Sequence, residues 1–411
     1  AFVATNLSAQ TIQQQIDAEL DSVSGNEYSA YITSDDGQVV YYERNPDTEL
    51  FPASNQKLFT SAAAFGMLGE DYAFKTEVYF TGFQSGSILS GSVNVVGYHD
   101  LTWNTYCLND TDDALEVIAQ RIRDLGITSI TGGVNVYGAT YYDRGQFDDV
   151  RKPGNTYDNA TVASRLRSLM QAQGIGVSGS ASAQTGFDAP GNLQFTHLST
   201  DLLYDNEESI HARLDEMPLD LATACIELNR VSHNAMADGL LFHLGYMDSG
   251  TSSLEAGAQA LKNWLENEVG IDTADIEIGD GSGLARGTSG DLAAGIPANR
   301  VSARATHALV KYAVENFRGY DTSLAISCQD GTISGRMCGS TTLTGASLAG
   351  RVHAKTGTLF NTIALSGYMD HPTSGERLFF SFLANNLSGI NSSLTRGAMD
   401  DALFDLADRI I

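Results

Sequence analysis

The distribution of strand-like and helical segments constrains the fold most strongly, because strand-like runs occur near both ends of the chain. Two β-rich runs around an Asp-Gly pair near the start have the pattern of a hairpin. Apolar residues have helical spacing over residues 12–20 and again over 393–410. In the second of these helices, Leu394, Leu403 and Leu406 are expected on the buried face. The pattern predicts one antiparallel sheet that is covered by the two terminal helices. The strand-like runs are residues 28–33, 39–42, 350–354, 362–369 and 377–384.

The middle of the chain differs, because strand-like and helical runs alternate there. Such alternation between about residues 72 and 200 predicts a separate α+β unit. After that unit helical patterns dominate as far as residue 269, and they predict a second, all-helical layer. A chain of 411 residues is long enough for two domains. We therefore predict an α+β fold in which residues 1–71 and 201–411 form one domain and residues 72–200 an inserted α+β domain.

Composition excludes several classes of partner. Asp and Glu outnumber Lys and Arg by 50 to 24, which gives a formal net charge of −26. A field of that sign repels nucleic acid and anionic lipid, so neither is an expected partner. No run approaches the roughly 20 apolar residues of a membrane span. Because the numbering starts at Ala1 and the first nine residues do not resemble a signal peptide, we expect a processed, mature form.

The four cysteines are not spaced as metal ligands. They are Cys107, Cys225, Cys328 and Cys338, and no two have C-x-x-C spacing. Cys328 and Cys338 flank a Gly-containing loop and could close it as a disulfide. Four buried thiols would fit the sequence equally well.

A first candidate for chemistry is Ser54-Asn55-Gln56-Lys57, at the start of a predicted helix. Residues three apart on a helix lie on the same side, so the Lys57 amine could take the proton of the Ser54 hydroxyl. A residue on the first helical turn also has an unpaired backbone N–H, and that of Ser54 could stabilise an oxyanion. Alone the pattern is weak, since an ordinary helix cap with a surface lysine would look the same.

A second candidate is Ser232-His233-Asn234, between two predicted helices. A hydroxyl and an amide two residues apart in a tight loop can point into one cleft. Ser232 could relay a proton to a leaving group, and Asn234 could hydrogen-bond a substrate amide. An N-cap turn without catalytic function is the alternative.

A third candidate is Lys355-Thr356-Gly357-Thr358, at the end of a predicted strand. Lys355 offers a cation that could bind a carboxylate or tune Lys57. Gly357 lets a substrate approach the backbone closely. Thr356 and Thr358 add hydroxyl donors, and the Thr358 N–H could be a second oxyanion donor. The order of the three motifs, S-x-x-K, S-x-N and K-T-G, matches the signature of β-lactamases and penicillin-binding proteins.

At this point a resemblance becomes specific, and it covers nearly the whole chain. The sequence resembles the D-alanyl-D-alanine carboxypeptidase/endopeptidase family of low-molecular-mass class C penicillin-binding proteins. Residues 51–58 (FPASNQKL) resemble the nucleophile segment of that family, and residues 280–286 (DGSGLAR) resemble its D-G-S-G-L-S-R loop. Asp330-Gly331-Thr332 with Arg336 resembles its D-G-T-L-x-x-R segment, and Leu359 and Gly367-Tyr368 continue the pattern.

The resemblance implies a penicillin-binding-protein/β-lactamase-like fold and a serine-type D-Ala-D-Ala carboxypeptidase or endopeptidase. It implies that Ser54 attacks a peptidoglycan stem peptide, with Lys57 as general base. It further implies that penicillins acylate the same serine, that neither metal nor cofactor takes part, and that the protein is periplasmic or secreted. The remaining residues implied to act are Ser232, Asn234 and Lys355 in catalysis, Ser282, Gly283, Thr356, Gly357 and Thr358 in substrate binding, and the N–H groups of Ser54 and Thr358 in the oxyanion hole.

Two positions depart from the family pattern. His233 stands where the family usually has Asp or another residue. We expect a solvent-facing loop histidine there, although it could add a pH-sensitive contact. Gly97-Tyr98-His99-Asp100 stands where many members carry G-x-G-D-P, which puts substrate contacts from the inserted domain in doubt.

Other interpretations accept the same motifs but differ in the substrate, or in whether the protein is an enzyme at all. A β-lactamase, an esterase or a D-amino-acid amidase would use the same chemistry on another substrate, although no candidate deacylating Glu is evident near the motifs. A non-catalytic β-lactam- or peptidoglycan-binding protein is the alternative from a different class. The sequence has no G-x-S-x-G elbow, which argues against an α/β-hydrolase. The oligomeric state is not predicted.

Overall fold

A computed structural model of the chain describes residues 11–102, 113–138, 142–143, 156–157, 159–204, 217–274 and 276–409. The chain divides into two compact units, each of which is described by itself. The first unit comprises Ala1–Ala62, Asn229–Val231 and Lys262–Ile411, and the second comprises Ala63–Leu228 and Ser232–Leu261. The domain boundaries expected from the sequence stay a prediction.

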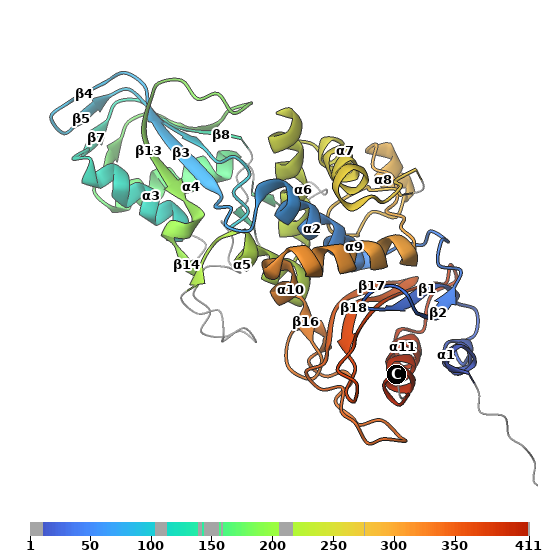
Figure 1. Ribbon diagram of the computed structural model, residues 1–411. Coiled ribbons are helices and arrows are strands. Elements are labelled where there is room, and N and C mark those ends of the chain that lie inside the picture. The colour runs from blue at the N-terminus through green and yellow to red at the C-terminus, as the bar shows by residue number, and fades with distance from the viewer. Residues whose placement is uncertain are drawn as a thin grey trace, which may run out of the picture. The chain divides into compact units, whose positions relative to one another are not determined.

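The first unit is built on a six-stranded antiparallel sheet that joins both ends of the chain, as the sequence predicts (Figure 1). Strands from the C-terminal part lie next to the N-terminal hairpin, because β19 pairs with β1 from Glu27↔Asn385 to Ser34↔Leu378. The strand order is β16 (Ala325–Ile326), β17 (Val352–Leu359), β18 (Thr362–Asp370), β19 (Arg377–Asn385), β1 (Glu27–Ser34) and β2 (Val40–Arg44).

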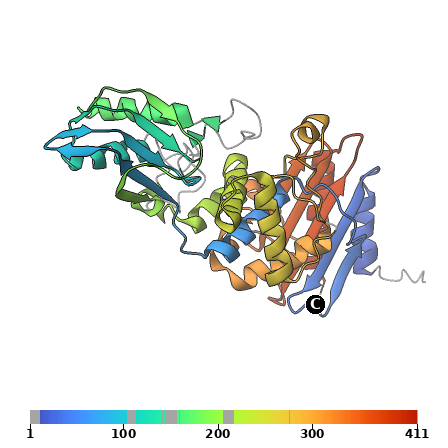
Figure 2. The same cartoon turned by 90° about the horizontal axis from the view of Figure 1, so that it is seen from above.

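Helices cover both faces of this sheet (Figures 1 and 2). The terminal helices α1 (Ile12–Asp21) and α11 (Ser392–Ala407) pack against each other and close the main apolar core on one face. α1 starts at Thr11 with a capping box, and its Ile16 and Leu20 are buried. The other face is covered by α9 (Ala303–Asn316), which packs on β19, β1 and β18. The predicted layering of sheet and terminal helices is therefore confirmed.

Two details differ from the expectation. Leu403 and Leu406 of α11 are buried, but Leu394 is 58% exposed. It lies on the first turn, outside the stripe of buried residues that begins at Thr395, so helical spacing alone placed it on the wrong side. The helix α9 was not predicted, although its N-cap Ser302 and the spacing of its buried apolar residues were there to be read.

The second unit contains the predicted mixture of strands and helices. Its larger sheet has the order β12-β8-β6-β3-β13, and its smaller sheet has the order β11-β7-β5-β4. The strand-like runs 88–96 and 127–137 are each split in two at glycines. α4 packs on β8, β12 and α3. The bounds are β3 (Lys75–Phe80), β4 (Phe83–Ser85), β5 (Ile88–Ser90), β6 (Val93–Val96), α3 (Asp113–Asp124), β7 (Ser129–Ile130), β8 (Val134–Tyr137), α4 (Asn159–Ala172), β11 (Gly176–Val177), β12 (Ala181–Ala183) and β13 (Asn192–Leu198).

Helices dominate the part of the chain that follows, as predicted. The short helix α5 (Leu221–Ile226) continues as a π-helical turn (Glu227–Val231), and α6 (Asn234–Ser249) begins two residues later. α7 (Leu254–Trp264) also ends in a π-helical turn (Leu265–Val269). No helix in the described ranges has both the length and the apolar character needed to cross a bilayer. The shorter elements are β9 (Tyr142–Asp143), β10 (Thr156–Tyr157), β14 (Leu203–Tyr204), β15 (Met217–Pro218), α8 (Ser289–Ala293) and α10 (Arg318–Ser323).

A disulfide closes the loop that the sequence singled out. Cys328 and Cys338 are bonded, with their Cα atoms 5.0 Å apart, and the loop between them includes a 3-10 turn (Gly331–Ile333). The alternative of four buried thiols is therefore wrong. Cys225 is a buried free thiol, and Cys107 lies outside the described residues.

Removing this disulfide should destabilise the first unit. Closing a loop of this length restricts the unfolded chain by about 3 kcal/mol, so Cys328→Ser with Cys338→Ser should lower the melting temperature measured by calorimetry. The double variant should then be insensitive to reductant, whereas wild type should lose about the same stability when reduced. An unchanged melting temperature in the double variant would contradict a stabilising role for the bond.

Candidate active site

The Ser54 segment is a tight turn that is hydrogen-bonded to the central sheet. Ser54 lies in a 3-10 turn (Ala53–Asn55) that leads directly into α2 (Gln56–Leu68). Upstream of it, the Asn385 side chain on β19 accepts from Phe51 N at 2.8 Å and donates to Phe51 O at 3.2 Å. Downstream, Asn55 Nδ2 donates to Ser366 Oγ on β18 at 2.7 Å. The turn is therefore held to two strands from either side of Ser54. We call residues 51–55 the nucleophile turn, after the candidate nucleophile that they carry.

The turn also carries backbone strain. Ala53 has φ = 47°, which is the left-handed region that non-glycine residues rarely adopt. Such a conformation costs on the order of 1 kcal/mol and persists only where the surroundings enforce it. Strained residues of this kind cluster at functional sites, and this one immediately precedes the candidate nucleophile.

Lys57 lies next to Ser54, as the helical spacing predicts, but it is not a surface lysine. Its side chain is fully buried, and Nζ donates to Ser54 Oγ at 3.1 Å and to the main-chain carbonyl of Ser282 at 2.7 Å. An ordinary helix cap with an exposed lysine is therefore excluded. The distance between Nζ and Oγ is within the reach of direct proton transfer.

The Asp280–Arg286 loop is the second element of the site. Its conformation is fixed by the buried Asp280 carboxylate, which accepts from Gly283 N at 2.7 Å and from Ala285 N at 2.6 Å. Asn299 Nδ2 also donates to Asp280 Oδ1, at 2.8 Å. The loop lies directly against the nucleophile turn, because a Cβ added at Gly283 would lie 1.8 Å from the Ala53 carbonyl oxygen. Gly283 also has φ = 91°, so both the lack of room for a side chain and the backbone conformation require glycine.

The third element is β17, which carries Lys355, Thr356, Gly357 and Thr358. A Cβ at Gly357 would lie 2.6 Å from the Pro52 carbonyl oxygen, so glycine permits this strand to pass close to the nucleophile turn. Lys355 is fully buried and donates to Thr356 O at 3.0 Å. Its pKa is held well below the usual range, first because burial penalises the charge and second because Lys57 repels it. Thr356 is half-buried and Thr358 is exposed.

A cavity of about 600 Å³ lies beside the two threonines of this strand. Arg396 of α11 donates to Thr358 Oγ1 at 3.3 Å, and Thr356 Oγ1 donates to Thr332 Oγ1 at 2.8 Å. Arg336 on its wall is neutralised by a bidentate pair with Asp400. The full lining is Thr332, Gly335, Arg336, Thr356, Thr358, Ser393, Arg396, Gly397 and Asp400.

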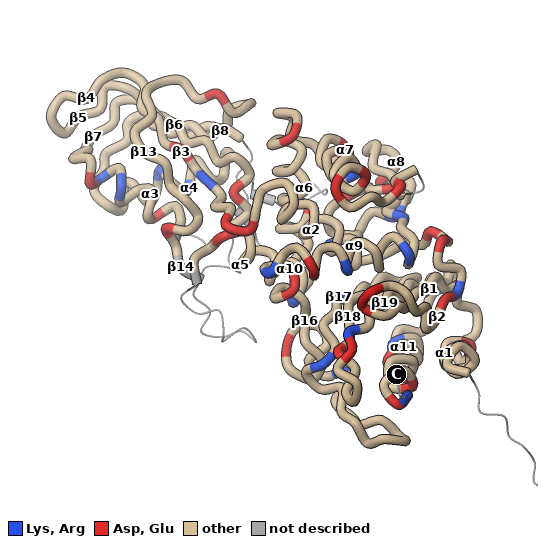
Figure 3. The backbone as a smooth tube through the Cα atoms, in the orientation of Figure 1, with Lys and Arg blue, Asp and Glu red and all other residues tan. Residues whose placement is uncertain are grey.

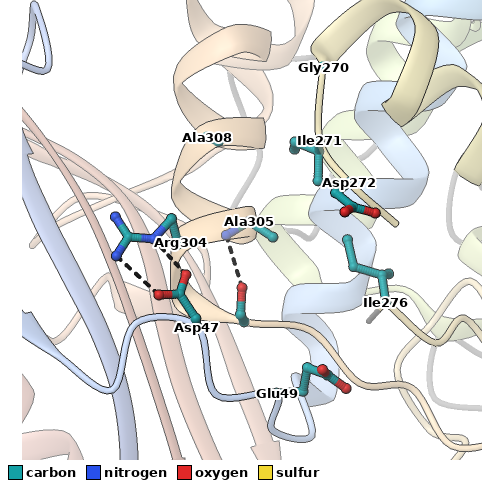
Figure 4. A pocket seen from close by; sticks show the side chains of 10 residues that line it. Asp47, Glu49, Gly270, Ile271, Asp272, Ile276, Arg304, Ala305 and Ala308 are labelled. Atoms are coloured by element: carbon teal, nitrogen blue, oxygen red, sulfur yellow. Dashed lines mark hydrogen bonds and ion pairs between the residues drawn. The ribbon is translucent and has the colours of Figure 1, made fainter. Parts of the chain in front are cut away.

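Another cavity of the first unit, of about 330 Å³, contains none of the predicted site residues (Figure 4). Its wall includes the ion pair between Arg304 and Asp47, at 2.6 Å, and the start of α9 at Ala305. Glu49 and Asp272 add further acidic groups, in keeping with the excess of Asp and Glu along both units (Figure 3). The residues that line it include no lysine, histidine or cysteine.

The second motif has the predicted local structure but belongs to the second unit. Ser232 follows the π-helical turn in a left-handed conformation (φ 69°, ψ 43°), and Asn234 is the first residue of α6. The three residues before Ser232 belong to the first unit, where Asn229 Nδ2 donates to Ser61 Oγ at 3.1 Å. Arg230 pairs there with Asp330 at 2.9 Å.

The expectation for His233 was wrong. Its side chain is fully buried, and Nδ1 accepts a hydrogen bond from Met236 N at 3.2 Å. It is the N-cap of α6 and not a solvent-facing loop residue. The N-cap turn that was the alternative for this motif is therefore present, with His233 as the cap, although histidine is not among the preferred N-cap residues.

Comparison with known proteins decides the family. The sequence profile of the D-Ala-D-Ala carboxypeptidase 3 (S13) family matches residues 10–184 and 204–406, which is most of the chain. The chain belongs to this family. It is also 26% identical over 431 residues to a D-alanyl-D-alanine carboxypeptidase from Actinomadura sp., covering 85% of this chain and 76% of that protein. As a member of the S13 family, the chain is a hydrolase of the D-Ala-D-Ala carboxypeptidase type.

Solved structures confirm the fold that the resemblance implied. Penicillin-binding protein 4 from Haemophilus influenzae matches with a TM-score of 0.74 at 17% identity, covering 96% of this chain and 99% of that one. A penicillin G-acylated predatory endopeptidase from Bdellovibrio bacteriovorus, in complex with an immunity protein, matches with a TM-score of 0.54 at 17% identity. That match covers 93% of this chain and 91% of the other.

Several residues that shape this candidate site were missed by sequence reasoning. Asn385 and Ser366 anchor the nucleophile turn, and Asn299 supports the Asp280 loop. Arg396 contacts the third motif from the C-terminal helix. These side chains act through tertiary contacts with positions more than ten residues away, and no local pattern marks them.

Gly283 should be intolerant of a side chain, and Gly176 provides a control. Gly283→Ala would push the loop or the nucleophile turn out of place, and displacements of about 1 Å in catalytic sites cost on the order of 100-fold in rate. Gly176 lies on β11 of the second unit, and an added Cβ there would meet no atom closer than 3.8 Å, so Gly176→Ala should retain the rate. Acylation kinetics with a chromogenic or fluorescent penicillin would measure both. Equal rates for the two variants would contradict the inferred close approach.

Proposed function

We propose that the chain cleaves the peptide bond before a terminal D-Ala of peptidoglycan stem peptides through an acyl-enzyme on Ser54. The observation that carries the proposal is the buried Lys57 amine, which lies 3.1 Å from Ser54 Oγ. Lys57 is also close enough to a second buried lysine, Lys355, to lower the pKa of Lys355. Two positive charges repel each other, so Lys355 also favours the neutral amine that Lys57 needs as a base.

In the first step Lys57 takes the Ser54 proton while Oγ forms a bond to the carbonyl carbon of the penultimate D-Ala. The N–H groups of Ser54 and Thr358 would stabilise the oxyanion, and electrostatic stabilisation of this kind contributes several kcal/mol in comparable sites. The carbon–nitrogen bond then breaks, and the proton passes to the leaving D-Ala nitrogen. Water adds to the ester, releases the shortened peptide and restores Ser54.

Ser232 and Asn234 are proposed to complete this relay, with Ser232 passing the proton and Asn234 binding the substrate amide. What supports their inclusion is the segment immediately before them. Asn229 is hydrogen-bonded to Ser61, which lies one helical turn beyond Lys57 on α2.

The terminal carboxylate of the substrate is proposed to bind at Lys355, Thr356 and Thr358, with Ser282 and Gly283 on the opposite wall. Two hydroxyl groups at the edge of β17 and the guanidinium of Arg396 beside Thr358 offer donors to an anion. Penicillins, which carry a carboxylate beside a strained amide, would acylate Ser54 at the same place.

We also propose that residues 72–200 form an inserted domain and that the protein works outside the cytoplasm, at the cell wall. The Cys328–Cys338 disulfide supports that location, because structural disulfides persist in oxidising compartments.

Benzylpenicillin should add one penicilloyl unit to the intact mass of the protein, and Ser54→Ala should abolish the addition. Trypsin digestion should then locate the adduct on the peptide that contains Ser54. An unmodified wild-type mass at saturating drug would falsify the assignment of the nucleophile.

Release of D-Ala from a D-Ala-D-Ala peptide separates the proposed enzyme from its rivals. A binding protein would form the penicilloyl adduct but release no D-Ala above the Ser54→Ala background. A β-lactamase would turn over the penicillin rapidly, so that its adduct would not accumulate.

Lys57→Arg should fold but lose acylation by about 100- to 10,000-fold, because a guanidinium keeps the charge and cannot act as a base. Lys311→Arg is a suitable control, since Lys311 lies on α9 in an ion pair with Glu315. Thermal unfolding would show that both variants are folded. Acylation of Lys57→Arg at the rate of the Lys311→Arg control would remove Lys57 as the base.

A further inference from the structure

The second motif is held by a histidine that links two helical elements. His233 N donates to the carbonyl of Glu227, at the start of the π-helical turn, at 3.2 Å. Its side-chain Nδ1 accepts from Met236 N, in the first turn of α6, at 3.2 Å. The two neighbours of His233 in the sequence are Ser232 and Asn234. Whatever fixes His233 therefore fixes the backbone directions of both.

The turn needs such a restraint. Ser232 has φ = 69° and ψ = 43°, and a non-glycine residue pays for this left-handed conformation with about 1–2 kcal/mol. An N-cap hydrogen bond contributes a comparable amount, and here it closes directly after the strained residue. The His233 side chain is fully buried, so the lost bond could not simply be replaced by bulk water.

The chemistry of this cap differs from that of Ser, Thr, Asn or Asp. A backbone amide can only donate, so Nδ1 must be unprotonated to accept from Met236 N. A protonated imidazole has two N–H groups and no acceptor, so the cap is lost when the ring takes up a proton.

We propose that His233 is a positioning residue whose neutral imidazole caps α6 and holds Ser232 and Asn234 in place, so that acid releases the second motif. This inference rests on the proposed function, because it assigns Ser232 and Asn234 to the reaction.

Charged residues occur on both of the elements that His233 links, the π-helical turn and α6. Glu227 and Arg230 belong to the π-helical turn, and Asp238 belongs to α6. Glu227 and Asp238 are buried, and the Arg230 guanidinium is paired with Asp330. Protonation removes the Nδ1 acceptor whatever these groups contribute, so they affect the pH of the transition and not its direction.

Four variants test the proposal. His233→Ala removes the cap, whereas His233→Asn and His233→Asp restore an acceptor that needs no neutral imidazole. Ser302→Ala is the matched control, because Ser302 Oγ caps α9 by accepting from Ala305 N at 3.1 Å. The second-order rate constant for acylation by benzylpenicillin is measured for each from about pH 5 to 8, together with the melting temperature.

At neutral pH, His233→Ala should be acylated about 10- to 100-fold more slowly than wild type, and His233→Asn should recover to within about 3-fold. Ser302→Ala should have a lower melting temperature than wild type but the same acylation rate. Toward acid, wild type should lose its rate relative to His233→Asn, because only the imidazole cap is lost on protonation. Ionisations that both proteins share cancel in this ratio.

Unchanged acylation of a folded His233→Ala protein would overturn the inference. If that variant does not fold, a ratio of wild type to His233→Asn that is constant with pH overturns it equally. Absence of any acylation in wild type is a different result, which defeats the proposed function itself.

Discussion

Two buried amines govern the geometry of the site. The chain carries a net charge of −26 and only six lysines, yet Lys57 and Lys355 are both fully buried. A buried ammonium group is costly unless acceptors replace its lost water. Lys57 finds them at Ser54 Oγ and at the Ser282 carbonyl, and Lys355 finds one at the Thr356 carbonyl. The nucleophile turn and the Asp280–Arg286 loop must therefore converge on Lys57, because each supplies it with an acceptor. β17 brings Lys355 close enough to Lys57 for the two amines to repel each other.

Convergence of three backbone segments requires positions without side chains. Gly283 and Gly357 are those positions, since a Cβ on either would collide with carbonyl oxygens of the nucleophile turn. The strain at Ala53 is sustained by the same contacts, together with the Asn385 and Ser366 hydrogen bonds that tie the turn to the sheet. The second motif is organised in the same way, with a left-handed Ser232 sustained by the cap on its neighbour.

Local sequence patterns predicted the helices and strands better than they predicted which of their residues are buried. The hairpin, the terminal helices and the strands of the central sheet follow from alternation and helical spacing, which depend on nearby residues alone. Leu394 was misplaced because its spacing fits the helix but its turn lies outside the buried stripe. His233 was misjudged because a loop position between two helices gives no sign of burial. The helix α9 was missed although it covers an entire face of the sheet.

The sequence by itself determined the family and the candidate residues, because the order of S-x-x-K, S-x-N and K-T-G and the flanking segments are properties of the chain. Only the tertiary structure decided that Lys57 is buried beside Ser54, that Lys355 carries a lowered pKa and that Asp280 fixes the Gly283 loop. The physical reason is that burial of the two amines and the repulsion between them need α2 and β17 to lie close together. These segments are about 300 residues apart in the sequence, and no local pattern predicts a contact between them.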